Sequence, residues 1–241
     1  MLQPPSREVH IWRAGLDLPP GTTARLSATL SSGERERSAR FRFERDRQRF
    51  IAAHGVLRDV LARYLRTAPG RISYRYNASG KPELGPEFGG RLNFNLSHSA
   101  GLALIAIAAD SSVGVDLECL RAQADYAEIA RSFFSATEVE QLSALPGPLC
   151  AEDFMRCWTK KEAYLKACGV GLAMPLHSFS VPLRSGPTHG PVEHGAACNE
   201  PDPAKRWSFF TLQPAPGHIG ALAIEGSGWR LRQRHWAARQ S

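Results

Sequence analysis

The stretch WTKKEAYLK at residues 158–166 says most about this chain, together with GVDLE at residues 114–118. The first stretch is typical of a helix and places Glu162 and Lys166 on one face, one turn apart. The second is typical of a strand and carries two carboxylates that share a face. Three acids with lysines nearby suit a magnesium ion that holds a phosphate-rich substrate. The sequence therefore raises the hypothesis of phosphoryl chemistry.

Composition and charge narrow the class of protein. The 241 residues allow one large domain or two small ones. A chain that is 43% hydrophobic and 22% charged has the balance of a soluble globular protein. Thirty Lys and Arg residues against 23 Asp and Glu give a net charge of +7. A basic protein attracts an anionic partner, which can be a nucleic acid, a nucleotide-like cofactor or an acidic protein.

The cysteines and the N-terminal sequence indicate a reduced, cytoplasmic protein. The five cysteines form no CxxC pair and no metal-ligand spacing. They are Cys119, Cys150, Cys157, Cys168 and Cys198. Residues 1–7 lack the basic and apolar regions of a signal peptide. No apolar run approaches the roughly 18 residues of a membrane helix, so we expect no membrane span.

Hydrophobic periodicity predicts helices followed by strands, twice over, in two similar halves that meet near residue 111. The first part of the chain, to residue 117, has a strand at 9–12, a turn at 19–21, helices at 35–41 and 50–65, and strands at 72–76, 92–96, 102–109 and 113–117. The second has helices at 126–131, 137–142 and 152–167, the last ended by Gly169, and strands at 179–183, 207–212 and 219–223. Residues 185–203 are rich in Gly, Pro and Asn, which predicts a long, mobile loop.

Asp116 and Glu118 have two interpretations. Two carboxylates on one strand face repel each other unless a cation or a basic group lies between them. A solvent-facing strand edge also explains a D-x-E pattern. The apolar neighbours Val113, Val115 and Leu117 place the pair where a buried strand meets water. Taken alone, this segment leaves a metal site and a solvent-facing edge equally open.

Glu162 and Lys166 share a helix face with Trp158. A routine surface ion pair is one explanation, and it would contribute roughly a few tenths of a kcal/mol. Lys160, Lys161 and Lys166, however, make the segment cationic around one acid. That pattern favours a metal–phosphate site, in which the lysines hold the anion and the acid holds the cation.

Two other segments carry groups that can bind phosphate. FNLSHS at residues 94–99 ends a strand in two hydroxyls and an imidazole. Ser97 and His98 can also be half of a hydrolase dyad, but no G-x-S-x-G elbow accompanies them. A lone Ser-His pair is more often a turn histidine with satisfied hydrogen bonds. GKP at residues 80–82 presents a lysine in a turn that lacks the Walker A pattern.

The arginines of residues 35–49 alternate with acids, which weakens a nucleic-acid interpretation in favour of a solvated helix face. Ser135 precedes Glu138 by three residues and predicts a capping box at a helix start. The capping role is the stronger interpretation of Glu138, and a catalytic role is the weaker one.

In this order, the segments at 80–82, 94–99, 114–118, 134–138 and 158–166 resemble those of the 4'-phosphopantetheinyl transferases of the larger, Sfp-like type, as does the basic helix. The resemblance runs from about residue 10 to residue 183. It implies an α/β fold of the α+β type, with two pseudo-twofold-related halves, each a small, mostly antiparallel sheet packed with helices. We expect an N-terminal half at 1–110, a C-terminal half with the metal site at 111–226 and a basic tail at 227–241, in a monomer.

The family moves 4'-phosphopantetheine from coenzyme A to a serine of an apo acyl, aryl or peptidyl carrier protein and releases adenosine 3',5'-bisphosphate. By this resemblance, Asp116, Glu118 and Glu162 hold Mg²⁺ against the pyrophosphate, and Mn²⁺ is also acceptable. His98 and Lys166 contact the phosphates and belong to the catalytic set.

The resemblance also assigns Arg49, Lys81 and Ser97 to the nucleotide end of coenzyme A and its 3'-phosphate. Glu162 is the expected base, directly or through a metal-bound water, and Glu138 is the competing candidate. Glu34 stands where some relatives keep a lysine, so one contact to the cofactor is missing or moved.

Two other functions stay open. A nucleic-acid-binding protein would use the arginine-rich helix, bind in a salt-sensitive way and give Asp116, Glu118 and Glu162 no role. A protein that binds coenzyme A without transfer is the other, and the intact acids argue against it. We expect neither nucleic acid nor a membrane among the partners.

Overall fold

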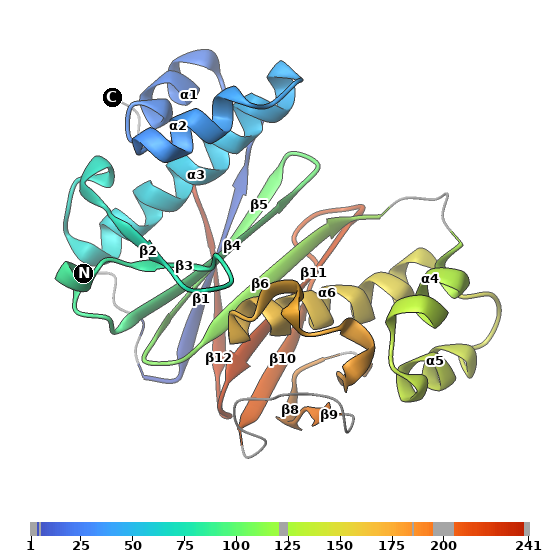
Figure 1. The fold of residues 1–241 in the computed structure, drawn as a ribbon. Coiled ribbons are helices and arrows are strands. Elements are labelled where there is room, and N and C mark those ends of the chain that lie inside the picture. Colours follow the sequence, from blue (N-terminus) through green and yellow to red (C-terminus); the bar gives the residue numbers. More distant parts are fainter. Residues whose placement is uncertain (1–3, 5, 121–124, 185, 195–204, 239–241) are drawn as a thin grey trace.

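The structure is a computed structural model that describes residues 4, 6–120, 125–184, 186–194 and 205–238. Its two halves each contain a four-stranded sheet packed with helices (Figure 1), which confirms the expected mixed α/β fold. Among the described residues, no helix combines the length and the apolar character needed to cross a membrane.

The first sheet has the strand order β12-β1-β5-β4, and all neighbours are antiparallel except β1 and β12, which are parallel. Its strands are β1 (Glu8–Gly15), β4 (Leu92–Ser99), β5 (Leu102–Ala109) and β12 (Arg230–His235). The helices α1 (Pro20–Ser27), α2 (Ser32–Ala39) and α3 (Glu44–Leu65) cover one face. A small hairpin of β2 (Tyr74–Tyr76) and β3 (Pro82–Leu84) follows α3.

The second sheet has the order β6-β11-β10-β8, with antiparallel neighbours throughout. Its strands are β6 (Val113–Cys119), β8 (Thr188–Pro191), β10 (Arg206–Leu212) and β11 (His218–Glu225). The long helix α6 (Ala151–Cys168) lies across it, and α4 (Tyr126–Phe133) and α5 (Ala136–Ser143) lie towards one end of α6. The short strands β7 (Phe179–Ser180) and β9 (Glu193–His194) pair with each other. Single 3₁₀ turns are η1 (Pro69–Arg71), η2 (Pro86–Phe88), η3 (Gly171–Ala173) and η4 (Leu176–Ser178).

Side chains join the two sheets at a seam between β4 and β6. The backbone N–H of Val115 donates to Asn95 Oδ1 at 2.9 Å. On the apolar side, Val9 and Ile11 of β1 belong to the same buried cluster as Val115 of β6 and Leu222 of β11. The seam therefore has a continuous core, and polar side chains of β4 and β6 meet along it.

Four details differ from the sequence expectations. The turn predicted at 19–21 is the start of α1, because Pro20 occupies a first-turn position where proline is tolerated. The basic helix ends at Ala39, and α3 begins separately at Glu44. Within the expected loop, residues 188–191 form β8 and pair with β10, while residues 185 and 195–203 lie outside the described residues. Residues 230–235 form a strand of the first sheet.

Candidate active site

Gly114 lets α6 lie directly on β6. A Cβ at this position would stand 2.1 Å from the Ala163 carbonyl oxygen and 2.4 Å from the Ala167 nitrogen, far inside van der Waals contact. Only glycine permits this approach of helix to strand. Because Glu162 and Lys166 flank the contact on α6, their side chains are brought to the seam beside Asp116.

Lys166 and Asp116 form the charged centre of the seam. Lys166 Nζ lies 2.6 Å from Asp116 Oδ1 and donates to Ser97 Oγ at 3.1 Å. Ser97 Oγ in turn donates to the same carboxylate oxygen at 3.1 Å. Asp116 is buried. The predicted residues Ser97, Asp116 and Lys166 therefore meet, although they come from β4, β6 and α6.

Glu118 and Glu162 extend this centre. Ser99 Oγ donates to Glu118 Oε2 at 3.2 Å. The two acids, two residues apart on β6, are therefore each paired with a serine, Ser97 or Ser99, on β4. Burial raises the pKa of Glu162, and the negative charges of Asp116 and Glu118 add to the increase while Lys166 opposes it. The three carboxylates are close enough to repel one another, as the sequence predicted for a pair that lacks a cation.

The donor set fits a hard cation in its chemistry. Asp116 Oδ2 is buried and has no hydrogen-bond partner among the described residues, so one carboxylate oxygen is left for a ligand. All three acids offer oxygen, which Mg²⁺ prefers. They are not gathered into a closed ligand cluster, however: across the described parts of the chain, no three His, Cys, Asp or Glu side chains converge as a complete metal site.

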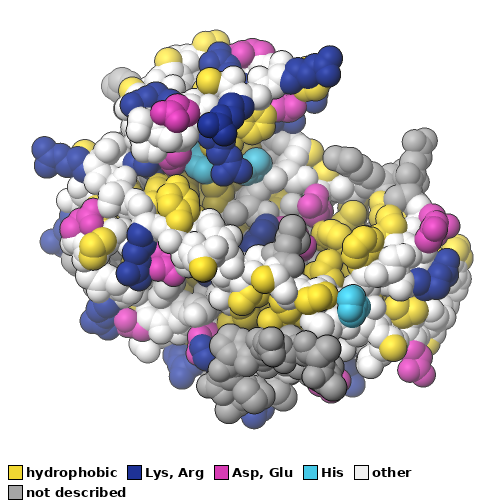
Figure 2. Space-filling model, viewed as in Figure 1, with side chains coloured by type: hydrophobic (Ala, Val, Ile, Leu, Met, Phe, Trp, Pro, Cys, Tyr) yellow, Lys and Arg dark blue, Asp and Glu magenta, His cyan; other side chains and the backbone are white. Residues whose placement is uncertain are grey.

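His98 follows Ser97 on β4 and faces three basic side chains. Desolvation, followed by the charges of His54, Lys166 and Arg37, lowers the pKa of His98 to about 4. The imidazole is therefore neutral at pH 7. Figure 2 shows Lys and Arg side chains over the α1–α3 region and histidines directly beneath them. The sequence predicted His98 as a site residue, but not Arg37 or His54. These two residues lie far from His98 along the chain, so the sequence does not show that they are near it.

Lys81 lies at the junction of the halves, with its ammonium group turned to the end of α6. Nζ donates to the Ala167 carbonyl at 2.9 Å and the Val113 carbonyl at 3.3 Å. Burial lowers the pKa of Lys81 to about 8. A cation at a helix C-terminus complements the helix dipole. Lys81 thus has a structural contact that the sequence did not predict.

A pocket of about 270 Å³ opens beside Lys81 at the junction. Residues from both halves line it, among them Lys81, Asn95, Glu162 and Lys166. Most of the exposed pocket wall is apolar, and Lys81, Glu162 and Lys166 add charged groups to the lining. Such a lining suits a ligand with a charged end and a less polar arm.

Arg49 lies on α3 beside the turn between β4 and β5. Its guanidinium makes a two-point ion pair with Asp17, with Nε and Nη2 donating at 2.7 and 2.8 Å. A Cβ on Gly101 would stand 3.0 Å from Arg49 Nη2, so the guanidinium touches the turn. Arg47 is likewise paired with Glu44. Glu44 is one of the acids that alternate with the arginines of this segment.

The prediction that Lys160 and Lys161 hold a bound anion is wrong. Both side chains are fully buried on the opposite side of α6. Lys160 Nζ donates to the carbonyls of Pro182 and Arg184 at 2.8 and 2.9 Å. Positions 160 and 161 lie away from the helix face shared by 158, 162 and 166. The spacing of these positions along a helix is enough to predict this difference.

Lys161 instead pairs with Glu138. Its Nζ lies 2.8 and 2.6 Å from the two carboxylate oxygens. Glu138 also accepts from the backbone N–H groups of Ser135 at 2.9 Å and Val181 at 2.8 Å, and it is 1% exposed. The predicted capping box at Ser135 is present. Glu138 is thus a saturated structural carboxylate, away from the Asp116 centre.

Comparison with known proteins gives matches along most of the chain. A family model described as the 4'-phosphopantetheinyl transferase superfamily matches residues 112–221, and one described as the N-terminal part of 4'-phosphopantetheinyl transferase matches residues 21–111. The chain is 40% identical over 232 residues to 4'-phosphopantetheinyl transferase HetI of Nostoc sp., covering 96% of this chain and 93% of that protein.

Two further relatives are more distant. A phosphopantetheinyl transferase of Thraustochytrium sp. is 30% identical over 238 residues, covering 92% of this chain and 80% of the relative. The 4'-phosphopantetheinyl transferase Sfp of Bacillus subtilis is 32% identical over 160 residues, covering 66% of this chain and 69% of the relative. The two family models meet at residues 111 and 112, where β5 gives way to β6.

Proposed function

This chain belongs to the 4'-phosphopantetheinyl transferase superfamily, and we propose that it transfers 4'-phosphopantetheine from coenzyme A to a serine of an apo carrier protein. The observation that carries the proposal is the centre at the seam, where Asp116, Glu162 and Lys166 meet beside a pocket shared by both halves. The centre combines carboxylates that can hold a cation with a lysine that can hold an anion. Chemistry on a pyrophosphate requires both kinds of group.

The reaction needs a base and charge neutralisation. The serine oxygen of the carrier forms a bond to the β-phosphorus of coenzyme A, and the bond from that phosphorus to the bridging oxygen breaks. Adenosine 3',5'-bisphosphate leaves with the bond's electron pair. A serine hydroxyl is a weak nucleophile at neutral pH, so a positioned group must take its proton. Glu162 is the proposed acceptor, because its raised pKa makes the carboxylate a stronger base than an exposed glutamate.

The anionic oxygens of the pyrophosphate repel a nucleophile unless cations face them. Lys166 supplies one fixed positive charge at the seam, and His98 offers a hydrogen-bonding ring beside it. Asp116, Glu118 and Glu162 are the proposed ligands of Mg²⁺, or of Mn²⁺. When bound there, the cation would neutralise charge on the pyrophosphate.

We propose that the nucleotide end of coenzyme A binds to the first half of the protein. We propose that Arg49, Lys81, Ser97 and His98 lie along this part of the ligand. Ser97 and Lys81 reach the seam and the pocket wall, respectively. Arg49 would contact the nucleotide from the N-terminal part of α3, beside its partner Asp17.

The partners follow from charge and family. The net charge of +7 favours acidic acyl, aryl or peptidyl carrier proteins, because opposite charge speeds their encounter. We propose that the enzyme acts as a cytoplasmic monomer in two halves, 1–110 and 111–226, followed by the basic segment 227–241. The ion pairs of Arg47 with Glu44 and of Arg49 with Asp17 disfavour a nucleic-acid partner, because these two arginines are already paired with acids.

The test is a transfer assay followed by intact mass. The protein is incubated with coenzyme A, MgCl₂ and a panel of apo acyl, aryl and peptidyl carriers, and adenosine 3',5'-bisphosphate is measured in parallel. We expect one phosphopantetheine per carrier and an equal amount of the bisphosphate. Folded protein that neither binds coenzyme A nor modifies any carrier would overturn the proposal.

A further inference from the structure

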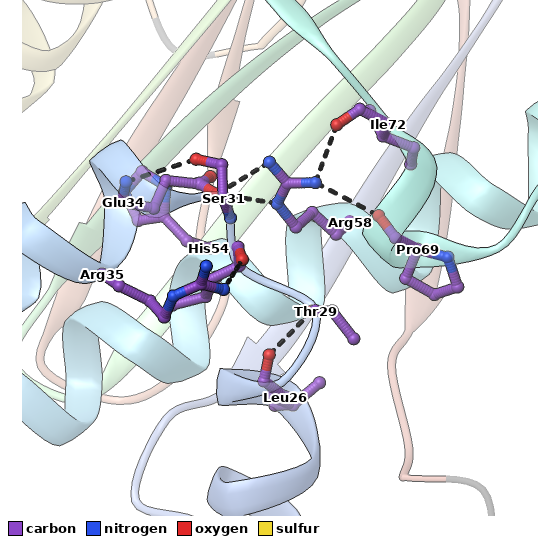
Figure 3. A network of polar contacts seen from close by, with 10 residues as sticks. Leu26, Thr29, Ser31, Glu34, Arg35, His54, Arg58, Pro69 and Ile72 are labelled. Carbon is purple, nitrogen blue, oxygen red and sulfur yellow. Dashed lines mark hydrogen bonds and ion pairs between the residues drawn. The ribbon is translucent and has the colours of Figure 1, made fainter.

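A buried ion pair fastens α2 to α3 near the proposed site. Arg58 donates from Nε at 2.8 Å to Glu34 Oε2, and its Nη2 lies 2.7 Å from the same oxygen. Arg58 is also held by the Ile72 carbonyl at 2.8 Å (Figure 3). Burial alone would raise the pKa of Glu34, but hydrogen bonds from His54, Arg58 and Ser31 lower it to about 2. Glu34 is therefore a permanent buried anion, not a site for phosphate.

The second oxygen of Glu34 holds His54. His54 Nδ1 lies 3.3 Å from Glu34 Oε1, and a carboxylate can only accept, so Nδ1 carries a proton. The ring of Phe50, one turn earlier on α3, packs against the imidazole at a centroid distance of 4.1 Å. His54 Nε2 has no hydrogen-bond partner within the described ranges, and the side chain is 21% exposed. Two contacts thus fix the ring and leave one nitrogen for a ligand.

His54 lies near His98, which belongs to the proposed coenzyme A site. The charges of His54, Lys166 and Arg37 all lower the pKa of His98, after desolvation. The four groups come from α3, α6, α2 and β4. Arg37 is itself held over the Phe50 ring, with its guanidinium carbon 5.5 Å from the centroid. Lys166 and Arg37 carry positive charge on different elements, and an anion bound among these groups offsets their repulsion.

We propose that His54 is a positioning residue that binds the phosphate group contacted by His98, with Glu34 holding its ring in place. The inference rests on the proposed function and extends it to a residue pair outside the matching motifs. His54 Nε2–H donates to a phosphate oxygen while Nδ1–H donates to Glu34. A hydrogen bond to an anionic acceptor is stronger than one between neutral groups. The negative charge of Glu34 thus supports phosphate binding through the histidine.

Two substitutions separate phosphate binding from support of Glu34. In His54→Asn, the side-chain amide stands near the Nδ1 position and still donates to Glu34, but it cannot reach the Nε2 position. In His54→Gln, the amide reaches the Nε2 position. We expect His54→Asn to raise the Kd and KM for coenzyme A about tenfold, about 1.4 kcal/mol. We expect kcat to stay within about twofold, the melting temperature to stay unchanged, and His54→Gln to recover part of the affinity.

Isothermal titration with coenzyme A gives Kd independently of transfer. His189→Gln, at an exposed residue of β8, is the matched control, with no expected change. If the wild type transfers the group and His54→Asn binds coenzyme A as tightly as it does, the assignment of His54 is overturned and the proposed function stands. If His54→Asn lowers only the melting temperature, His54 merely supports Glu34 and the inference is wrong. A folded wild type that neither binds coenzyme A nor transfers the group overturns both.

Discussion

The carboxylates of the seam differ in how their charge is balanced. Asp116 has Lys166 at 2.6 Å and a hydroxyl at 3.1 Å on one oxygen, while its other oxygen is buried without a partner among the described residues. Glu162 has a raised pKa because burial and two neighbouring acids disfavour its ionised form. Asp116 therefore has an oxygen available for a ligand, and the raised pKa of Glu162 favours its acceptance of a proton.

Replacing Glu162 by Gln should separate function from stability. We expect transfer to fall by about 100-fold or more, the usual contribution of a general base. The folded pKa of Glu162 is raised, so its ionised form opposes folding above the unfolded pKa. Glu162→Gln should therefore leave the melting temperature at pH 7 unchanged or higher, as measured by calorimetry without metal. Wild-type turnover in this variant would remove Glu162 from the mechanism.

His98 gives a pH dependence with a defined sign. Its folded pKa is about 4, against an ordinary value of 6.5. Between these values the unfolded chain takes up a proton that the folded protein does not, so the free energy of unfolding falls as pH drops through this window. Above pH 6.5 the ring is neutral in both the folded and the unfolded state, so His98 causes no loss of stability there.

The measurement is urea unfolding of the wild type and His98→Asn at several pH values from 7.5 to 4.5. We expect a smaller acid-induced loss of stability in His98→Asn. Parallel pH profiles for the two proteins would contradict the lowered pKa assigned to the exposed side chain of His98.

At the scale of elements, the placement of α6 on β6 decides whether the site exists. The helix carries Glu162 and Lys166, the strand carries Asp116 and Glu118, and Gly114 is the point of closest approach. On its other side, α6 is fixed by the buried pair of Lys161 and Glu138. The position of the site therefore depends on residues that never touch a substrate.

Gly114→Ala should displace α6. The added methyl group would overlap the backbone of Ala163 and Ala167, and overpacking of this kind costs roughly 1–3 kcal/mol or more. We expect a lower melting temperature and a loss of transfer in the fraction that stays folded. Gly15→Ala, at the end of β1 where a Cβ meets nothing within 4 Å, is the control and should behave as wild type. Equal stability and activity in both variants would contradict the contact.

Glu138→Gln tests the second candidate base. Removing this charge leaves Lys161 buried without its counter-ion, which typically costs about 3–5 kcal/mol. Because Glu138 is saturated by structural contacts, kcat per folded molecule should stay within about fivefold of wild type. Denaturant unfolding measures the loss of stability. Turnover normalised by active-site titration gives kcat per folded molecule. A stable Glu138→Gln protein without transfer would make Glu138 the base instead.

Periodicity and motif spacing predicted most elements and the central site residues, because each depends on local sequence. Asp116, Glu118, Glu162 and Lys166 were predicted to share faces, and the structure brings them to one seam. The roles of Gly114 and His54 could not be predicted, since they depend on contacts between distant segments. The error at Lys160 and Lys161 came from counting charge along the sequence without following the helix face.

At the scale of the whole molecule, the two halves are interlocked. The chain leaves the second sheet after β11 and returns as β12, parallel to β1 of the first sheet. Trp236, just beyond β12, is buried and donates to Asp59 of α3 at 2.7 Å. The tail was predicted as basic but not as a strand, because its side chains are mostly exposed at a sheet edge. This return anchors the C-terminal segment on the first sheet, at the edge opposite β4.

The most direct test of the central claim is metal-dependent transfer at this seam. The wild type is incubated with coenzyme A and a carrier that it modifies, once with MgCl₂ and once with EDTA, and the carrier is weighed by intact mass. We expect one phosphopantetheine with Mg²⁺, none with EDTA, and recovery when Mg²⁺ is restored in excess. Full transfer in EDTA, by protein freed of metal, would contradict the role proposed for Asp116, Glu118 and Glu162.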